Sequence, residues 1–361
     1  MTLVRIGFAK IALVLLTCNL AECVSEDKIN ILMWTHYSDA NITNDFLKLC
    51  PEQKCQLTYD RRMLNNSAAV VFYDRTVDVN DLPAQRLDKQ HFVFFLMETP
   101  YYKSVEAFDK LKKNFYTLTM TYRTDSDIYS PFGYFKRRKN PIEIDRDQLL
   151  AVARNKTKMI GWLGSNCKAA SKRYLYMDEL KKHINLDIYG KCGLDKCAKT
   201  ELIYTEEDPC EQLFRRDYKF YLAMENSVCN DWVTEKIFNR INMVSIPIIF
   251  NRSIYEAHVP GDAFIAADDF ESPQKLADYL HKLALDDEKY IQYFEWRKHY
   301  ETVTFPDGVN SGFCRLCQHL TDEKNNGNFH ISPKAQDLQG WFVEKSECIP
   351  NFVPDLLARQ K

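Results

Sequence analysis

Residues 219–250 have a pattern that predicts a strand, a polar loop, a helix and a second strand in direct succession. Residues 220–223 form the short apolar run that is typical of a buried strand, and a second such run closes the segment. Between the two runs, apolar residues recur every three or four positions over 232–243, after Asn230 and Asp231 as candidate N-caps. The segment therefore predicts an α/β fold in which a helix N-terminus faces the cleft beyond the first strand.

The start of this helix is suited to a diphosphate, because free backbone N–H groups and the helix dipole favour negative charge there. Lys236 adds an ammonium group near the first turn, and Glu235 beside it can accept two sugar hydroxyls. A Glu-Lys pair on its own is more often a solvated ion pair on a helix surface. The assignment of these two residues therefore depends on the motifs found elsewhere in the chain.

Composition favours an oxidising compartment and argues against a nucleic-acid partner. The length of 361 residues allows roughly two domains, and a formal net charge of −2 supplies no positive field for nucleic acid. The chain has 12 cysteines and four Asn-x-Ser/Thr sequons, at Asn41, Asn65, Asn155 and Asn251. Together these features predict passage through the secretory route.

Residues 1–24 have the pattern of a targeting segment. Arg5 and Lys10 precede an apolar run at 11–16, which matches the charged and apolar parts of a signal peptide. Counted from 6 to 23, the same segment is a short type II signal anchor, although polar residues interrupt the roughly 20 apolar residues expected of a span. A cleaved signal peptide and a signal anchor both remain open, and no later stretch is apolar enough to cross a membrane.

Apolar strand-like runs alternate with amphipathic or polar stretches in both halves of the chain, which predicts two α/β domains facing each other across a cleft. We expect an N-terminal domain at 29–140, a charged linker around 136–157, a C-terminal domain at 156–320 and a tail at 321–361 packed by disulfides. In such open sheets, ligands bind beyond the carboxyl ends of the strands. The predicted strands are 29–34, 55–59, 68–73, 92–97, 115–120, 159–163, 186–189, 220–223, 244–250 and 263–266, and the predicted helices are 169–183, 232–243, 273–284 and 287–300.

A single carboxylate, Glu98, follows the apolar run at 92–97, and Pro100 ends the strand two residues later. A carboxylate that emerges from an apolar strand into a cleft is in a position where its pKa can be tuned for general-base catalysis. Seen alone, the same carboxylate could also cap the following turn or pair with a basic residue. Glu98 is therefore a candidate catalytic base.

Asp125, Ser126 and Asp127 offer two carboxylates one residue apart. Such a pair can chelate Mg²⁺ or Mn²⁺ together with a diphosphate. The same residues can instead form a polar turn in which the aspartates accept hydrogen bonds from their own backbone. Both interpretations remain open from the spacing alone.

Arg173 lies on a predicted helix that follows the strand end at 161–167, a segment closed by small polar residues. A planar guanidinium can bond two phosphate oxygens at once, so Arg173 is a candidate phosphate ligand. The alternative is a solvated helix face that Arg173 shares with Lys172 and Lys181.

Cys314 and Cys317 have the spacing of a zinc half-site or a redox pair. No second CxxC and no histidine pair at zinc-finger spacing accompanies them. In an oxidising lumen, structural disulfides are therefore the favoured use of these two cysteines.

Taken together, the motifs resemble those of the α-1,3/4-fucosyltransferases, glycosyltransferase family 10. The run FYLAMENSVCNDWVTEK at 220–236 is similar to the family's signature. The other similar segments occur in the family's order and extend the resemblance to roughly 29–320: TMTYRTDSDI at 119–128, GWLGSNC at 161–167 followed by Arg173, DIYGKCG at 187–193, PGDAFIAADDF at 260–270 and YFEWR at 293–297.

The resemblance implies a GT-B-like fold of two Rossmann-like domains, in which the N-terminal domain handles the acceptor and the C-terminal domain binds GDP-fucose. By motif position, Glu98 takes the place of the general base. Arg173 and Lys236 take the places that neutralise the donor's pyrophosphate, and Glu235 takes the place that binds the ribose. Asn226 lies in the Glu-Asn-Ser segment that contacts the nucleotide.

The chain departs from the family pattern at two positions near this signature. Met224 stands where the family commonly has Phe, and Trp232 stands where Tyr is usual. Trp232 keeps an aromatic side chain in the implied donor site but lacks a phenolic hydroxyl. It therefore has no hydroxyl for a phosphate contact.

The implied reaction is inverting transfer of L-fucose from GDP-β-L-fucose to the 3-hydroxyl of a GlcNAc on glycoprotein or glycolipid glycans. The acceptor context, whether lactosamine, LacdiNAc or the N-glycan core, is left open by the sequence. No cofactor and no metal ligand is implied for the chemistry, although Mn²⁺ or Mg²⁺ can stimulate such an enzyme. The implied location is the Golgi lumen on a type II membrane anchor, with secretion after signal cleavage as the alternative.

Two other functions compete with this one. The first is a catalytically inactive luminal glycan-binding protein of the same fold. The second is a metal-dependent GT-A glycosyltransferase built on Asp125 and Asp127. The first is disfavoured because all four residues to which the resemblance gives a role are present: Glu98, Arg173, Glu235 and Lys236. The second is disfavoured by the position of the two aspartates in the acceptor half of the chain.

Overall fold

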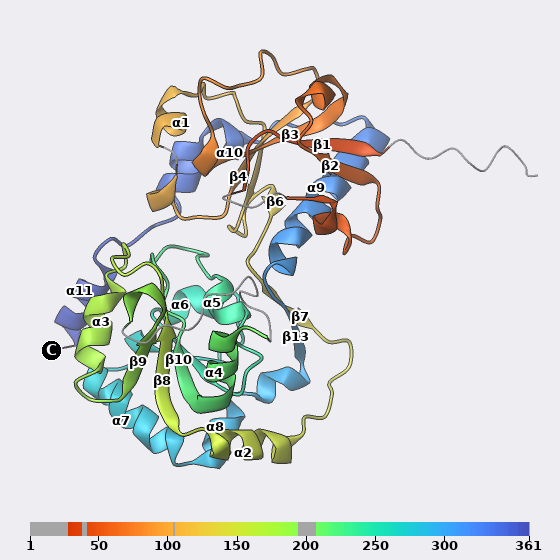
Figure 1. Ribbon diagram of the computed structural model, residues 1–361. Helices are drawn as coiled ribbons and strands as arrows, with labels where there is room; N and C mark the ends of the chain where they lie inside the picture. Colours follow the sequence, from red (N-terminus) through yellow and green to blue (C-terminus); the bar gives the residue numbers. More distant parts are fainter. Residues whose placement is uncertain (1–27, 38–41, 104, 194–206, 361) are drawn as a thin grey trace, which may run out of the picture.

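Two parallel sheets organise the chain into two lobes (Figure 1). The computed structural model describes residues 28–37, 42–103, 105–193 and 207–360. The predicted targeting segment at 1–24 and the sequon at Asn41 lie outside these residues. No helix in the described part of the chain is both long and apolar enough to cross a membrane.

The first lobe contains a six-stranded sheet in the order β2-β1-β3-β4-β5-β6, and all neighbouring strands are parallel. The central strands β3 and β4 are almost continuously apolar and buried, as expected for a parallel sheet that is covered on both faces. The strands are β1 Ile29–Met33, β2 Cys55–Thr58, β3 Ser67–Tyr73, β4 His91–Leu96, β5 Leu118–Thr121 and β6 Ile128–Tyr129.

The second lobe contains a five-stranded parallel sheet in the order β12-β11-β10-β8-β9. The strand order reverses between β8 and β10, and α/β sheets bind ligands at such a switch point. The predicted fold class, α/β with two Rossmann-like domains in a GT-B-like arrangement, is confirmed. The strands are β8 Lys158–Leu163, β9 Leu186–Tyr189, β10 Tyr218–Leu222, β11 Ile246–Ile249 and β12 Ile265–Ala266.

Helices cover both sheets, and most of them belong to the second lobe (Figure 1). The longest amphipathic helix of that lobe, α7, places Leu276 and Leu280 in its core. The helices are α1 Val105–Lys110, α2 Arg146–Asn155, α3 Arg173–Leu180, α4 Pro209–Asp217, α5 Glu235–Phe238, α6 Arg252–Tyr255, α7 Pro273–Ala284, α8 Asp287–Gln292, α9 Asp307–Asn326, α10 Pro333–Gln336 and α11 Phe352–Arg359.

The charged passage at 136–157, predicted as the linker, lies between the last strand of the first sheet and the first strand of the second, and it contains helix α2. Asp145 caps α2 by accepting a hydrogen bond from the backbone N–H of Gln148 at 2.9 Å. The charges that suggested a linker form ion pairs with α8 and the turn after it, such as Arg154 with Asp287 at 2.8 Å. The charged side chains of this passage therefore lie at a contact between helices α2 and α8.

A two-stranded antiparallel ribbon lies beside the second lobe, where the chain crosses between the lobes (Figure 1). Its strands are β7 Tyr134–Arg137 and β13 Tyr300–Val303. The helix predicted at 287–300 ends at Gln292, and a 3-10 turn at Glu295–Lys298 leads into β13 instead. The chain thus passes between the lobes through a paired ribbon.

Helix α9 returns to the first sheet, although the predicted bounds 156–320 assigned most of it to the second domain. It contacts β1 and β6, and two disulfides, Cys50–Cys314 and Cys55–Cys317, attach it there. The expectation of structural disulfides for Cys314 and Cys317 is therefore met, with partners that the spacing did not identify. Beyond α9, α10 contacts β5 in the first lobe and α11 contacts α3 in the second, so the tail joins both lobes.

Replacing both Cys55 and Cys317 by Ala is expected to lower the free energy of unfolding by about 2–3 kcal/mol. The loss stays small because the Cys50–Cys314 bridge remains. It joins residues 264 positions apart and closes nearly the same loop as the removed bridge, which joins residues 262 positions apart. Urea denaturation of the oxidised proteins measures the difference. A variant that no longer folds would show that the second bridge does more than close a loop.

Candidate active site

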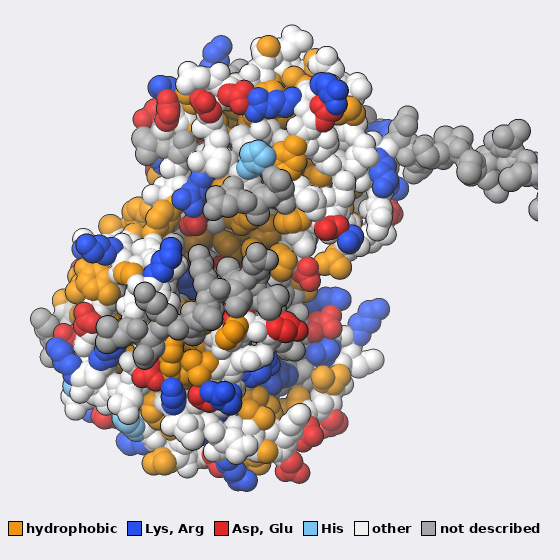
Figure 2. Space-filling model, viewed as in Figure 1, with side chains coloured by type: hydrophobic (Ala, Val, Ile, Leu, Met, Phe, Trp, Pro, Cys, Tyr) orange, Lys and Arg blue, Asp and Glu red, His pale blue; other side chains and the backbone are white. Residues whose placement is uncertain are grey.

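A pocket of about 240 Å³ lies between the two lobes, at the carboxyl ends of the central strands β4 and β10. Hydrophobic side chains are visible in the hollow between the lobes (Figure 2). Five of the six predicted site residues line this pocket, and Arg173 does not. The lining residues are Tyr37, Tyr73, Met97, Glu98, Phe132, Asn226, Trp232, Glu235, Lys236 and Phe305.

Glu98 enters the pocket from the loop that follows β4. Burial raises the pKa of the Glu98 carboxyl from its ordinary value of 4.5 to about 7, and the positive charges of Arg75 and Lys236 limit the rise. Its Oε2 atom is buried and has no hydrogen-bond partner among the described residues. A carboxylate with a pKa near neutrality and an oxygen without a donor is well suited to accept a proton.

Arg75 is a site residue that the sequence analysis missed. It follows the carboxyl end of β3, and its Nη1 lies 3.6 Å from Oε1 of Glu98. The signal was present, because a charged pair, Asp74 and Arg75, directly follows a buried strand next to β4. Arg75 orients one oxygen of Glu98 and leaves the other available.

Lys236 reaches the pocket from the opposite lobe. Its Nζ lies 2.9 Å from Oε2 of Glu225 and 3.3 Å from Oε1 of Glu235. Burial opposes the charged form of Lys236, but these two carboxylates more than offset it, so the pKa of Lys236 lies above its ordinary value. The lysine is therefore a fixed positive charge that faces Glu98 across the pocket.

Glu225 is the second residue to which the sequence analysis gave no role of its own, since it was placed only in the polar loop and the Glu-Asn-Ser segment. Its side chain is 3% exposed, and its Oε1 accepts hydrogen bonds from the backbone N–H of Thr234 at 3.0 Å and from the Thr234 hydroxyl at 2.7 Å. Burial raises the pKa of Glu225, and Lys236 limits the rise. Glu225 thus fixes both the start of α5 and the ammonium group of Lys236.

The helix predicted over 232–243 is a single turn, Glu235–Phe238, followed by turns. Its N-cap is Thr234 and not Asn230 or Asp231. Asp231 is used elsewhere, because its Oδ2 accepts hydrogen bonds from the backbone N–H and the hydroxyl of Thr124 in the first lobe, at 3.0 and 2.9 Å. Positive charge in this part of the pocket therefore comes from the Lys236 side chain more than from a long helix dipole.

Asn226 and Trp232 act together in the pocket wall. Oδ1 of Asn226 accepts a hydrogen bond from Nε1 of Trp232 at 2.9 Å. The indole ring also packs edge to face against Phe132 and Tyr122 of the first lobe, with centroid distances of 5.5 and 4.7 Å. The indole N–H of Trp232 therefore holds the side chain of Asn226 in the pocket wall.

Arg173, at the start of α3, lies behind the pocket at the β8/β10 switch point. Its Nη1 donates to the carbonyl oxygen of Met224 at 2.8 Å, and its Nη2 donates to that of Asn166 at 2.9 Å. The guanidinium is buried, and its Nε has no hydrogen-bond partner among the described residues. Arg173 holds together the loops that follow β8 and β10. Its positive charge also interacts electrostatically with the carboxylate of Glu225 and the ammonium group of Lys236.

Asp125 and Asp127 are both engaged by the protein, although their partners are other side chains and the distant Thr119 rather than the backbone of their own turn, which the polar-turn interpretation expected. Asp125 pairs with Arg123 at 2.9 Å and accepts a hydrogen bond from Nε1 of Trp341 at 2.9 Å. Asp127 accepts from the backbone N–H and the hydroxyl of Thr119, and from Ser332. The alternative of a GT-A metal site is not supported by this arrangement.

A second hollow, of about 390 Å³, lies at the opposite end of the second sheet. It is open and polar, and Lys158 and Asp187 at the amino ends of β8 and β9 lie on its rim. Open parallel sheets bind ligands at their carboxyl ends. We therefore assign the site to the smaller pocket between the lobes.

Comparison with known proteins gives matches along nearly the whole described chain. The family model described as fucosyltransferase, N-terminal, matches residues 26–133, and the model described as glycosyltransferase family 10 (fucosyltransferase) C-term matches residues 153–341. The chain is 33% identical over 317 residues to alpha-(1,3)-fucosyltransferase C of Drosophila melanogaster, with 81% of this chain and 70% of that protein covered. It is 32% identical over 340 residues to an alpha-(1,3)-fucosyltransferase of Caenorhabditis elegans, with 91% and 86% covered.

Solved structures show the same fold. Crystal structures of an alpha1,3-fucosyltransferase with GDP and with GDP-fucose each match with a TM-score of 0.52, at 15% and 17% identity. The matches cover 91% and 90% of this chain and 96% of each of those chains. On the family models and the sequence relatives together, the chain belongs to glycosyltransferase family 10, the fucosyltransferases.

Proposed function

We propose that the protein is an inverting α-1,3-fucosyltransferase that moves L-fucose from GDP-β-L-fucose to the 3-hydroxyl of a GlcNAc residue in a glycan. The names of its relatives supply the linkage and the donor. The observation that carries the proposal is the pocket in which Glu98 of one lobe faces Lys236 of the other. An acid-base group and a cation on opposite walls match an acceptor on one side and a nucleotide on the other.

On the donor side, the diphosphate is placed against Lys236, with the charge of Arg173 behind it. As the bond between C1 of fucose and the β-phosphate oxygen breaks, its electron pair leaves with GDP and negative charge grows there. Groups that hold this charge better in the transition state than in the ground state lower the barrier. The ion pair with Glu225 keeps the Lys236 ammonium in place for that step.

On the acceptor side, Glu98 takes the proton of the sugar hydroxyl while the hydroxyl oxygen attacks C1 from the face opposite GDP. One bond to C1 forms and one breaks, so the β-linked donor gives an α-linked product. A single displacement needs one base and no covalent intermediate. The buried Oε2 atom of Glu98 is the proton acceptor in this scheme.

The value of kcat/KM is expected to fall about tenfold for each pH unit below pH 7 and to level off above it. Glu98 has a pKa of about 7 and acts only in its ionised form, so its protonation removes the base. Initial rates between pH 5.5 and 8.5 measure the profile. A profile that stays flat between pH 6 and 8 would exclude Glu98 as the titrating base.

The chemistry is expected to proceed without a divalent cation, because protein cations serve the departing GDP. Initial rates measured with EDTA, at a temperature well below the melting point, should remain within about twofold of those without it. Stimulation by Mn²⁺ or Mg²⁺ is then an effect on the protein or the acceptor. Loss of turnover within the dead time of EDTA addition, with the fold intact by circular dichroism, would contradict this expectation.

A Golgi lumen location, with the N-terminal segment as a type II anchor or a cleaved signal, completes the proposal. It is supported by the sequons and by the described disulfides, which need an oxidising compartment. Expression of the full chain with a C-terminal tag tests it. Tagged protein that is membrane-bound and protected from protease supports the anchor, and tagged protein in the medium supports signal cleavage.

A transfer assay decides between this enzyme and an inactive glycan-binding protein of the same fold. Purified protein is incubated with GDP-fucose and defined acceptors that carry lactosamine, LacdiNAc or the N-glycan core, and the linkage is read by mass spectrometry and NMR. An α-1,3-fucosylated product supports the enzyme and identifies the acceptor. Glycan binding without any transfer or hydrolysis of GDP-fucose would establish the alternative.

A further inference from the structure

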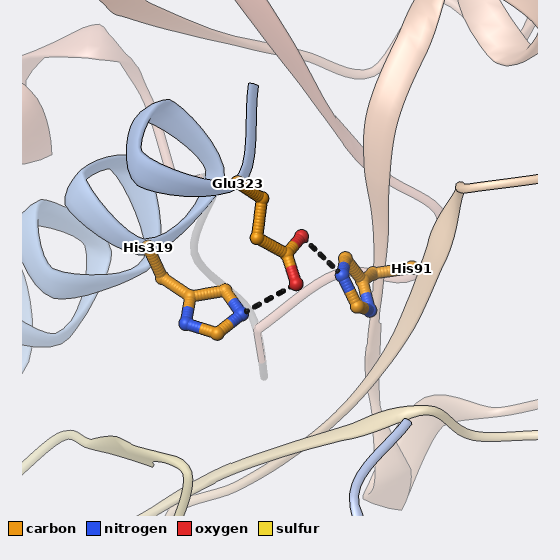
Figure 3. Close-up of side chains that lie close together, drawn as sticks. All are labelled: His91, His319 and Glu323. Atoms are coloured by element: carbon orange, nitrogen blue, oxygen red, sulfur yellow. Dashed lines mark hydrogen bonds and ion pairs between the residues drawn. The ribbon is translucent and has the colours of Figure 1, made fainter. Parts of the chain in front are cut away.

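His91, His319 and Glu323 come together at the end of the first sheet that lies away from the active site (Figure 3). His91 opens β4, and the other two residues lie one turn apart on α9. Among the residues that the structure describes, they are the only group of three or more His, Cys, Asp or Glu side chains with converging ligand atoms. These atoms all lie within 4.8 Å of one another.

Both imidazoles direct Nε2 toward the same carboxylate (Figure 3). Nε2 of His91 lies 2.7 Å from Oε2 of Glu323, and Nε2 of His319 lies 3.4 Å from Oε1. The Nε2 atom of His319 is buried and makes no hydrogen bond within the described structure. Buried polar atoms in folded proteins normally have a partner, so this atom calls for a ligand.

The surroundings of His91 match those of a metal-binding imidazole. Its ring is 1% exposed and stacks on Phe329 at 4.3 Å, and its Nδ1 lies 3.0 Å from the Thr117 hydroxyl. That hydroxyl can donate to the carbonyl oxygen of Phe92 at 3.2 Å, so its oxygen can accept a hydrogen bond from the Nδ1–H group as well as from the backbone N–H of Phe92. Histidine ligands typically donate one ring N–H in this way while the other nitrogen binds the metal.

We propose that His91, His319 and Glu323 form a zinc site that fastens the end of α9 to β4. Two imidazole nitrogens and one carboxylate are a ligand set of zinc, with water in the fourth position. Bonds of about 2.0–2.1 Å place tetrahedral ligand atoms roughly 3.3 Å apart, so the more distant atoms of the group must draw together, while Nε2 of His91 and Oε2 of Glu323, now 2.7 Å apart, must separate slightly. The side chain of His319, which is 30% exposed, has the freedom to make that movement.

The zinc site stabilises the fold and does not take part in the transfer reaction. His91 and Glu98 are separated by seven steps along β4 and its loop, or about 23 Å at the rise of a strand. The metal supports the far half of α9, beyond the two disulfides at Cys314 and Cys317. It therefore gives a route by which a divalent cation can stabilise the enzyme without entering the active site.

Zinc titration of the full-length protein, stripped of metal beforehand, tests the proposal. We expect one Zn²⁺ per chain by calorimetry and a melting temperature about 3–6 °C higher at saturating zinc. Co²⁺ in place of zinc should give the visible absorption of a tetrahedral site. Initial transfer rates below the melting point should be the same with and without zinc.

The variants His319→Ala and Glu323→Gln are expected to weaken zinc binding at least about 100-fold, because loss of a second-shell partner alone costs 10- to 100-fold. Asp322→Asn is the matched control, since it removes an exposed carboxylate from the adjacent position of α9 and leaves the three ligands intact. The control should bind zinc as the unmodified protein does. The proposal would be wrong if His319→Ala and Glu323→Gln left zinc affinity unchanged, or if the unmodified protein bound no zinc. The three side chains would then form only a hydrogen-bonded ion pair.

Discussion

Glu98→Gln is expected to lower kcat by about 10²–10⁴-fold while GDP affinity changes little. The amide keeps the shape of the side chain but cannot accept the proton of the acceptor hydroxyl. Glu98 lies on the wall opposite Lys236, so its loss leaves the nucleotide contacts in place. Steady-state kinetics with saturating acceptor and calorimetry with GDP measure the two effects separately.

The same variant should be more stable than the unmodified protein at pH 8, by about 2–3 kcal/mol. Burial gives Glu98 a folded-state pKa of about 7, above its ordinary value of 4.5, so the folded state binds more protons than the unfolded state between these values. The ionised carboxylate therefore costs stability above pH 7, and that cost disappears as the pH falls to 4.5. Urea denaturation at pH 8 and at pH 4.5 measures the difference.

Glu106→Gln provides the control for both measurements. Glu106 is an exposed residue of α1 that pairs only with Lys110 among the residues described, so its replacement should change neither turnover nor stability by much. Turnover of Glu98→Gln close to that of the unmodified protein would exclude Glu98 as the base. An equal stability gain in Glu106→Gln would show that the gain is not specific to the pocket.

Lys236→Met is expected to weaken GDP binding about 10- to 150-fold and to destabilise the fold by about 3–5 kcal/mol. The first effect is the loss of a charge-assisted contact to the diphosphate. The second arises because the carboxylate of Glu225, 3% exposed, would remain buried without its cation. Calorimetry with GDP and urea denaturation measure the two losses.

The double variant Lys236→Met/Glu225→Gln separates these two roles of Lys236. Removing both charges should restore part of the stability, because the carboxylate of Glu225 is the more deeply buried of the two that Lys236 neutralises, and only Glu235, 18% exposed, keeps its charge. GDP affinity should stay low, because the cation is still absent. Lys181→Met, an exposed position at the end of α3, is the control for a lysine lost from the same lobe. Unchanged GDP affinity in Lys236→Met would refute the contact with the diphosphate.

Much of the fold could be predicted because buried parallel strands leave a direct trace in the sequence. The apolar runs at 29–34, 68–73 and 186–189 correspond to β1, β3 and β9, with bounds within a residue. The place of Glu98 at the end of such a run also predicted its entry into a cleft. The carboxyl ends of strands from both sheets face the same pocket. Residues that directly follow predicted strands could therefore be identified as neighbours in the site from the sequence pattern alone.

The contacts that complete the site could not be predicted, because they join positions far apart in the chain or depend on backbone conformation. From the sequence, Glu225 is only a residue of a polar loop, and its contact with the Lys236 ammonium group is seen only in the folded structure. Asp231 reads as a helix cap, but its positive φ of 61° and its bonds to Thr124 remove it from that role. Helix α9 was assigned mostly to the second domain, because the spacing of Cys314 and Cys317 does not identify their partners Cys50 and Cys55 in the first lobe.

A crystal structure of the enzyme with GDP and a bound acceptor glycan tests the central claim most directly. The account predicts that the acceptor's 3-hydroxyl lies about 2.6–3.2 Å from a carboxylate oxygen of Glu98, with Nζ of Lys236 in hydrogen-bond contact with the diphosphate. An acceptor hydroxyl seated against another group on the far side of the pocket, with Glu98 out of reach after closure of the lobes, would contradict it.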